Sequence, residues 1–274
     1  MDTAAKIDTA VISVRGDDLS PELDGLANVT NTAGFSKKKK FGFARYMTAE
    51  ISDTGNPLQT AYAKAGEKAP LTKIPDGKVV FRSEKTILTG AQIIRDMGNL
   101  FPTKTRFEFS QVEFTFDVSA AALATIRRQA IHRARQTCSL VDDTGRRTLY
   151  VGSRHSPWQL RVYDKAERIV RIEFVFRREF LFKNGLLHPI DLLKLRVFDL
   201  EQLVTFRRVS PERLEEAAPD RSAKWREGVI RWAERWPISK LPAYLRDQGI
   251  PPGKVLRRTQ LQKKIMSMQK NFIW

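Results

Sequence analysis

The sequence predicts an α+β protein, with an antiparallel or mixed β-sheet and flanking helices followed by a basic helical C-terminal region. Residues 106–118 and 170–178 alternate apolar with polar side chains, which is the period of a half-buried strand. From Pro189 onward the apolar residues recur at the spacing of a helix instead. The 274 residues are enough to bury a sizeable core.

Composition divides the chain into three parts. We expect residues 1–36 to form an acidic, partly flexible N-terminal segment, residues 37–187 a sheet domain, and residues 188–274 the basic helical region. Periodicity and turn residues predict the remaining elements. These are strands at 10–14, 78–82, 148–151 and 160–163, helices at 90–100 and 119–136, and a long exposed loop over 52–78.

The charge of the chain is strongly basic and unevenly distributed. The formal net charge is +17, yet residues 1–36 hold six acidic against two basic residues. Residues 221–274 hold thirteen basic against three acidic residues. Such asymmetry points to a polyanionic partner, with nucleic acid ahead of an anionic membrane surface. A solvated basic surface without a ligand is the alternative.

Cysteine content and hydropathy bear on the compartment. Cys138 is the only cysteine, which excludes a disulfide framework and a cysteine-based zinc site and fits a reducing cytoplasm. The chain has no run of about 18 apolar residues, and acidic residues stand where a signal peptide would be basic. We therefore expect a cytoplasmic protein with no membrane partner.

Two apolar stripes lie in the C-terminal region. Trp225, Val229, Trp232 and Trp236 fall at i, i+4, i+7 and i+11, and Leu261, Ile265 and Met268 form a similar stripe in the last helix. Each stripe occupies one helical face. We expect both to pack in the core or against another helix rather than to hold a cofactor.

Three carboxylates fall on the polar faces of two predicted strands. Glu113 and Asp117 share one face of residues 111–117, and Glu173 lies on the polar face of residues 171–177. If the two strands are neighbours, the three carboxylates lie together beside several arginines. Oxygen ligands of this kind suit Mg²⁺ or Mn²⁺. Ordinary cross-strand ion pairs are the alternative.

The order of these segments resembles the replication initiators of rolling-circle plasmids and filamentous-type phages, and the related relaxases. The matching series is VEFTFD at 112–117, TLYVGSR at 148–154, LRVYDK at 160–165 and RIEFVFRREFL at 171–181, within a match that covers residues 106–185. The resemblance implies that residues 37–187 form a replication-initiator-like domain, with a five-stranded nickase-type sheet and a hairpin that helps to bind origin DNA. It also implies a divalent metal, Mg²⁺ or Mn²⁺, at Glu113, Asp117 and Glu173.

DNA, as an origin hairpin or a single strand, is the partner that the resemblance implies, together with a helicase or another replication protein. Ammonium and guanidinium groups can contact phosphates, and an indole can stack on an unpaired base. The DNA-binding candidates are Lys37, Lys38, Lys39, Lys40, Arg154, His155, Trp158, Arg161, Lys165, Arg171 and Arg177. For the lysine run, a solvated loop before a strand is the alternative.

The chain departs from the family at the cleaving tyrosine. Such initiators carry it soon after the Arg-x-Glu strand, where residues 178–184 hold phenylalanines instead. Of the five tyrosines, only Tyr244 sits on a candidate helix, and it shares a helical face with Gln248. This spacing resembles the nucleophile helix of single-tyrosine nickases of the insertion-sequence type. Tyr244 is therefore the candidate nucleophile and Gln248 a candidate metal ligand, with packing of Tyr244 against the tryptophan stripe as the alternative.

Three functions compete. The first is a replication-initiator-like protein that recognises an origin and nicks one strand by a metal-assisted tyrosine transesterification. The second is a non-catalytic DNA-binding protein on the same scaffold, which the missing tyrosine favours. The third is an RNA-binding module, which fits the charge but not the motif order.

Overall fold

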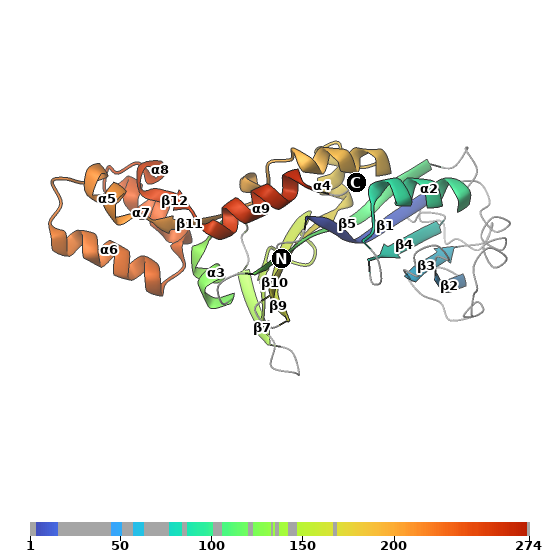
Figure 1. Cartoon of the computed structure of the whole chain (residues 1–274), viewed down its shortest axis with the longest axis horizontal. Helices are drawn as coiled ribbons and strands as arrows, with labels where there is room; N and C mark the ends of the chain where they lie inside the picture. The colour runs from blue at the N-terminus through green and yellow to red at the C-terminus, as the bar shows by residue number, and fades with distance from the viewer. Residues whose placement is uncertain are drawn as a thin grey trace.

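The computed structural model describes residues 4–15, 45–50, 57–62, 77–83, 87–100, 106–119, 123–132, 134, 137–141, 147–166 and 169–272. The largest feature of these residues is a nine-stranded sheet in which all neighbouring strands pair antiparallel (Figure 1). In sheet order the strands are β2 (Arg45–Glu50), β3 (Pro57–Tyr62), β4 (Gly77–Arg82), β1 (Lys6–Arg15), β5 (Arg106–Ser119), β10 (Ile169–Arg177), β9 (Trp158–Ala166), β8 (Arg147–Val151) and β7 (Thr137–Val141). The predicted α+β class with an antiparallel sheet is confirmed, and the described sheet is wider than the five strands that the resemblance implied.

The two central strands show why the sheet has one apolar and one polar face. Phe114 of β5 lies directly opposite Phe174 of β10, and both side chains are buried. Because successive side chains point to opposite faces, Glu113 and Glu173 lie on the other side of the sheet. The condition on which the sequence grouped the three carboxylates, that these two strands are neighbours, is met.

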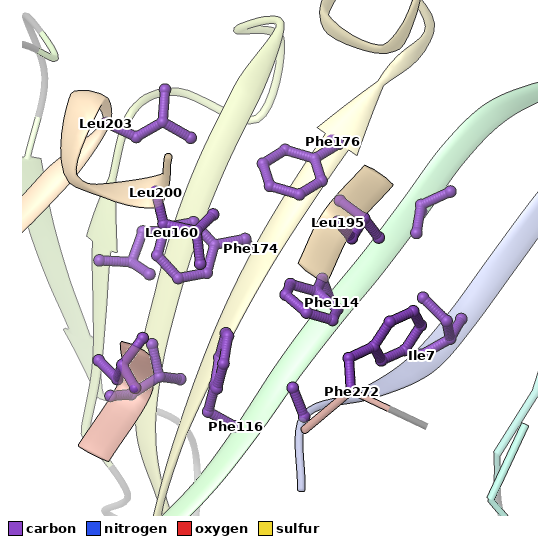
Figure 2. Close-up of a cluster of buried hydrophobic side chains, with 14 of the residues drawn as sticks. Ile7, Phe114, Phe116, Leu160, Phe174, Phe176, Leu195, Leu200, Leu203 and Phe272 are labelled. Carbon is purple, nitrogen blue, oxygen red and sulfur yellow. The ribbon is translucent and has the colours of Figure 1, made fainter. Parts of the chain in front are cut away.

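Helical segments cover the apolar face. They are α2 (Gly90–Leu100), α4 (Arg178–Lys183), the 3₁₀ segments η1 (Pro189–Arg196) and η2 (Leu200–Gln202), and α9 (Gln260–Lys270). Figure 2 shows phenylalanines of β5 and β10 packed with Leu195 of η1, Leu200 of η2 and Phe272, which follows α9. The rings of Phe176 and Phe180 are stacked with centroids 4.6 Å apart. Aromatic side chains therefore fix the helices to one side of the sheet.

A smaller lobe gathers at one end of the molecule, with α2 towards the other end (Figure 1). Its elements are β11 (Val204–Val209), α5 (Pro211–Ala217), α6 (Ala223–Arg235), η3 (Ile238–Lys240), α7 (Leu241–Asp247), α8 (Pro252–Val255) and β12 (Leu256–Arg258). Two earlier elements, α3 (Leu123–Gln129) and β6 (Ala130–His132), lie between this lobe and the sheet, and their Ile126 and Ala130 belong to the main core. A second core, centred on Leu214, Leu245 and Val255, holds it together. A three-stranded sheet in the order β12-β11-β6 joins it to the main body.

Three sequence predictions differ from the structure. The helix predicted over 119–136 is wrong beyond Gln129, because residues 130–132 form β6 and pair with β11. The loop predicted over 52–78 contains β3. The C-terminal region contains β11 and β12 besides its helices. In each case strand pairing outweighs the local pattern: β11 pairs with the distant β6 and β12, and β3 pairs with its chain neighbours β2 and β4.

The main core also extends past the boundary predicted at residue 188. Leu192 precedes the smaller lobe in the chain and Leu261 follows it, and both belong to the main core. The smaller lobe is thus a loop-out between η2 and α9 rather than a tail. Most of the acidic N-terminal segment lies outside the described residues, although β1 is an inner strand of the sheet. No helix in the described ranges is both long and apolar enough to cross a membrane.

Candidate functional site on the polar face of the sheet

A hollow of about 790 Å³ lies on the polar face of the sheet, across β1, β4, β5, β8, β9 and β10. Its side chains come from positions that alternate with the buried core residues of the same strands. The charged lining residues are Asp8, Glu113, Asp164 and Glu173, against Lys78, Arg82, Arg161 and Lys165. Negative and positive groups are therefore balanced in the hollow.

Arg161 joins two of the three predicted carboxylates. Its Nη2 donates to Oε1 of Glu113 at 2.5 Å, and its Nε lies 3.0 Å from Oε2 of Glu173. The second contact is an ion pair without the alignment of a hydrogen bond. Glu113 also accepts a hydrogen bond from Nε2 of Gln111 at 2.9 Å. The guanidinium thus bridges β5 and β10 from β9, the strand on the far side of β10.

Tyr163 shares Glu173 with Arg161. The phenol donates a hydrogen bond to Oε1 of Glu173 at 2.5 Å. The Glu173 side chain is buried, with 4% of its surface exposed. Burial raises the pKa of Glu173, more than the positive charge of Arg161 and the bond from Tyr163 lower it. Burial and the hydrogen bond to Glu173 both raise the pKa of Tyr163. The phenol therefore keeps its proton at neutral pH and is a poor nucleophile.

Arg171 holds the third carboxylate. Its Nε and Nη2 donate to the two oxygens of Asp117 at 2.6 and 2.9 Å, and its Nη1 donates to Asp8 at 2.8 Å. Lys165 adds a contact of 2.7 Å to Asp117. Burial alone would raise the pKa of Asp117, but the hydrogen bonds from Arg171 and Lys165 outweigh it and lower the pKa to about 2.

The structure brings the three predicted metal ligands onto one face but gives each a partner from the chain. Glu113, Asp117 and Glu173 contact Arg161, Arg171, Lys165 or Tyr163, as ordinary ion pairs would. Among the described residues, no group of three acidic, histidine or cysteine side chains is arranged to hold a metal ion. The Mg²⁺ or Mn²⁺ prediction therefore requires the arginines to leave the carboxylates, and it stays a prediction.

The hairpin tip is stabilised by its own polar groups. Gly152 adopts a φ of +87°, which favours glycine, and Ser156 Oγ accepts from the backbone N–H of Ser153 at 3.0 Å. Arg177 donates to the backbone carbonyl of Ser156 at 2.8 Å. Arg154 and His155 stand exposed on the turn. Arg177 thus supports the tip, and Arg154 and His155 are presented to solvent.

Trp158 lies on the other side of β9 from Arg161. It follows the same alternation as the buried Leu160 and Val162, and it packs half-buried against the main core. The predicted stacking platform is therefore on the apolar side of the strand. Lys37 to Lys40 lie outside the described residues.

Tyr244 and Gln248 are not brought to the carboxylates. Both lie in the smaller lobe, which Figure 1 shows separated from β9 and β10. The hydroxyl of Tyr244 accepts a hydrogen bond from Nε1 of Trp225 at 3.1 Å, and the two rings stack with centroids 6.4 Å apart. This is the packing against the tryptophan stripe that the sequence left as the alternative. Gln248 caps the end of α7.

Sequence reasoning assigned no functional role to three residues that belong to the hollow or its network. Tyr150 lines it from β8, opposite Arg161, and alternates with the buried Leu149 and Val151. Alternation alone could have placed Tyr150 on the polar face. Asp8 and Arg82 come from strands outside the matched segment, and no local signal linked them to it.

Comparison with known proteins assigns no family: no protein-family model matches the sequence, and no curated protein matches it. The resemblance to rolling-circle initiators therefore depends on the motif residues and on where those residues lie.

Proposed function

We propose that the protein is a replication-initiator-like DNA-binding protein, with a DNA strand seated on the polar face of the sheet. One observation carries the proposal. Glu113, Arg161 and Glu173 come from three separate motifs of the matched series, and Arg161 contacts both carboxylates at the hollow. If the short motifs resembled the family only by chance, there would be no reason for their charged residues to lie together. A shared site requires that they do.

Because the charges that line the hollow are balanced overall, attraction to DNA has to come from cations that no described carboxylate neutralises. Arg161, Lys165 and Arg171 are neutralised by carboxylates of the chain. Arg82 at the hollow and Arg154 at the hairpin tip are exposed, and neither forms an ion pair with a described residue. Guanidinium groups of this kind hold phosphates well. We expect both to contact DNA, together with the basic C-terminal region and the lysine run.

Salt dependence of DNA affinity tests this proposal. We expect the affinity for a fluorescent single strand, measured by anisotropy, to fall with salt at a log–log slope of about −4 or steeper, as for six or more phosphate contacts. Replacing Arg82 and Arg154 with glutamine should make the slope shallower by about 1.4, which is about 0.7 for each phosphate contact that is lost. Arg95→Gln, in α2 on the helix-covered side, where Arg95 pairs with Asp96 at 3.3 Å, is the control for an arginine away from the hollow. A slope near zero would contradict DNA binding, and clearly tighter binding of an RNA strand of the same sequence would favour the RNA-binding alternative.

Strand nicking is a second candidate, favoured by the two tyrosines that share the hollow with Glu113 and Glu173. Tyr163 is tied to Glu173 and keeps its proton, whereas Tyr150 has no hydrogen bond or ion pair to a described residue through its side chain. A bound Mg²⁺ or Mn²⁺ would supply charge to polarise a phosphate. Within this reading, Tyr150 is the better placed nucleophile, and Tyr244 stays the candidate from spacing.

A covalent adduct with a single-stranded oligonucleotide, formed only with Mg²⁺ or Mn²⁺, tests the nicking candidate. We expect Tyr150→Phe to lose the adduct and Tyr244→Phe to keep it. The reverse result would return the nucleophile to Tyr244. No adduct in the unaltered protein, with DNA binding intact, would leave a binding protein on this scaffold. In the same samples Mn²⁺ should raise the melting temperature, and Glu173→Gln should abolish that rise.

A further inference from the structure

The smaller lobe carries an aromatic groove that the proposed function does not use. It has a volume of about 410 Å³ and lies between α6 and α7, lined mainly by Trp225, Trp232 and Tyr244 with Val229 and Leu241. We call it the aromatic groove. It belongs to the smaller lobe, which Figure 1 shows away from β9 and β10.

The tryptophan stripe of α6 is only partly a packing surface. Val229 is buried, while Trp225 and Trp232 are half-buried at the edge of the smaller core. Trp236 ends the helix in an extended conformation and is 58% exposed. Tyr244 across the groove is 41% exposed. Large aromatic side chains thus line an open groove where the sequence predicted a buried face.

Gly228 keeps the space between the two indoles open. It lies in the interior of α6, three residues after Trp225 and four before Trp232. A glycine there costs the helix about 0.5–1 kcal/mol relative to alanine. An added Cβ would meet no atom within 4 Å, so packing among the described residues does not require a glycine at this place. A side chain of a binding partner that enters the space between the two indoles would require a glycine at position 228.

The groove has few polar groups, and the charged groups at its rim are cationic. Trp225 and Tyr244 satisfy each other by their hydrogen bond. Lys240 lines the rim, is exposed, and forms no ion pair with any described residue. The guanidinium of Arg221 lies 5.5 Å from the centre of the Trp225 ring. The nearby Glu227 is paired with Arg231 at 3.2 Å. The groove therefore offers apolar walls with positive charge at the rim.

We propose that the aromatic groove binds an acidic peptide segment of a partner protein, with one large apolar side chain seated between Trp225 and Trp232 and a flanking carboxylate at Lys240. Charge complementarity commits the proposal to an anionic partner, because residues 221–274 hold thirteen basic against three acidic residues. The apolar walls favour a peptide over a nucleobase. A base edge placed there would leave polar groups without hydrogen-bond partners, at a cost of about 1–3 kcal/mol each.

A short fluorescent peptide of aspartates that ends in leucine and phenylalanine is the probe. We expect saturable binding to the full chain, with a dissociation constant below about 1 mM. Replacing the aspartates with asparagine, or the last two residues with serine, should each weaken binding about tenfold or more, as for loss of a paired charge or an apolar anchor. No binding of the acidic apolar peptide would overturn the proposal.

Two variants locate the site. Gly228→Leu should fill the groove and weaken peptide binding at least tenfold, while its melting temperature stays the same or rises because leucine favours the helix. Gly98→Leu is the matched control, since Gly98 is also inside a helix with nothing within 4 Å of an added Cβ. Lys240→Glu should weaken the binding about tenfold, with Lys254→Glu as its control.

The outcome for DNA separates the groove from the sheet. Gly228→Leu should leave single-stranded DNA affinity unchanged. If Gly228→Leu leaves peptide binding intact, the proposal is wrong. If it abolishes DNA binding and an oligothymidylate displaces the peptide, the groove is a nucleic-acid site and the proposal is also wrong.

Discussion

The charge network on the sheet and the aromatic groove in the smaller lobe use similar side chains in opposite ways. In the network, Glu113, Asp117 and Glu173 each contact a cation or a phenol of the chain itself. In the groove, Lys240 forms no ion pair with a described residue, and Gly228 leaves a space that nothing fills. The network thus stabilises the sheet as it stands, whereas the groove is complete only with a partner.

This difference separates residues that hold the fold from residues that are available to a ligand. Arg161 and Arg171 look in sequence like phosphate-binding residues, yet their guanidinium groups are taken by carboxylates. Arg154, in the turn between β8 and β9, is exposed. Removing a residue of the first kind should change stability, and removing one of the second kind should change affinity.

The largest effect is expected at Arg171. Arg171→Met should lower the free energy of unfolding by about 3 kcal/mol or more, because Asp117 and Asp8 would lose their shared cation in a mostly buried place. Urea unfolding at pH 7 measures this. Arg82→Met, at an exposed lining position, should change stability by less than about 0.5 kcal/mol. Equal losses of unfolding free energy in Arg171→Met and Arg82→Met would contradict the distinction between the charge network and the exposed residues around it.

The next effect is expected at Trp158. Trp158→Ala should lower the free energy of unfolding by about 2 kcal/mol, because the indole packs half-buried against the main core. Trp236→Ala, whose indole is mostly exposed, should cost much less in the same thermal unfolding experiment. Full stability of Trp158→Ala together with weaker DNA binding would restore the stacking role that the sequence suggested.

A smaller effect is expected from the titration of Asp117. Its pKa in the folded protein is about 2, below the ordinary value of 3.8. The stabilisation from this carboxylate is therefore present above pH 4 and is lost as the pH falls towards 2, by about 1–2 kcal/mol. Asp117→Asn should be less stable than the unaltered protein at pH 6, and the two melting temperatures should converge near pH 2. A constant difference across this range would show that Arg171 does not favour the charged form of Asp117.

The sequence predicted the strands of the site well because a half-buried strand has a period of two. The alternation in β5 and β10 identified the polar face of each strand, which carries Glu113 and Glu173. Because the two strands are paired, these polar faces lie on the same side of the sheet. Alternation also predicted both strands of the hairpin. The second strand predicted from the sequence begins only at Leu160, which leaves Trp158 in the turn. In the structure β9 begins at Trp158, and the same period of two places Trp158 with Leu160 on the apolar face.

Other parts could not be read from local pattern. Asp8 reaches Arg171 only because β1 pairs with β5, about a hundred residues further along the chain. The helix predicted beyond Gln129 gives way to a strand because β11, more than seventy residues later, supplies hydrogen bonds. Contacts that depend on distant strand pairing leave no periodic trace in the segment itself.

The proposed function places DNA on the polar face of the sheet. Photo-cross-linking with a single strand that carries 5-bromodeoxyuridine, followed by mass spectrometry of the peptides, tests it most directly. The proposed function predicts adducts in β8, the hairpin tip and β9, with Tyr150 among the modified residues. Adducts confined to Trp225, Trp232 and Tyr244 of the smaller lobe would contradict it.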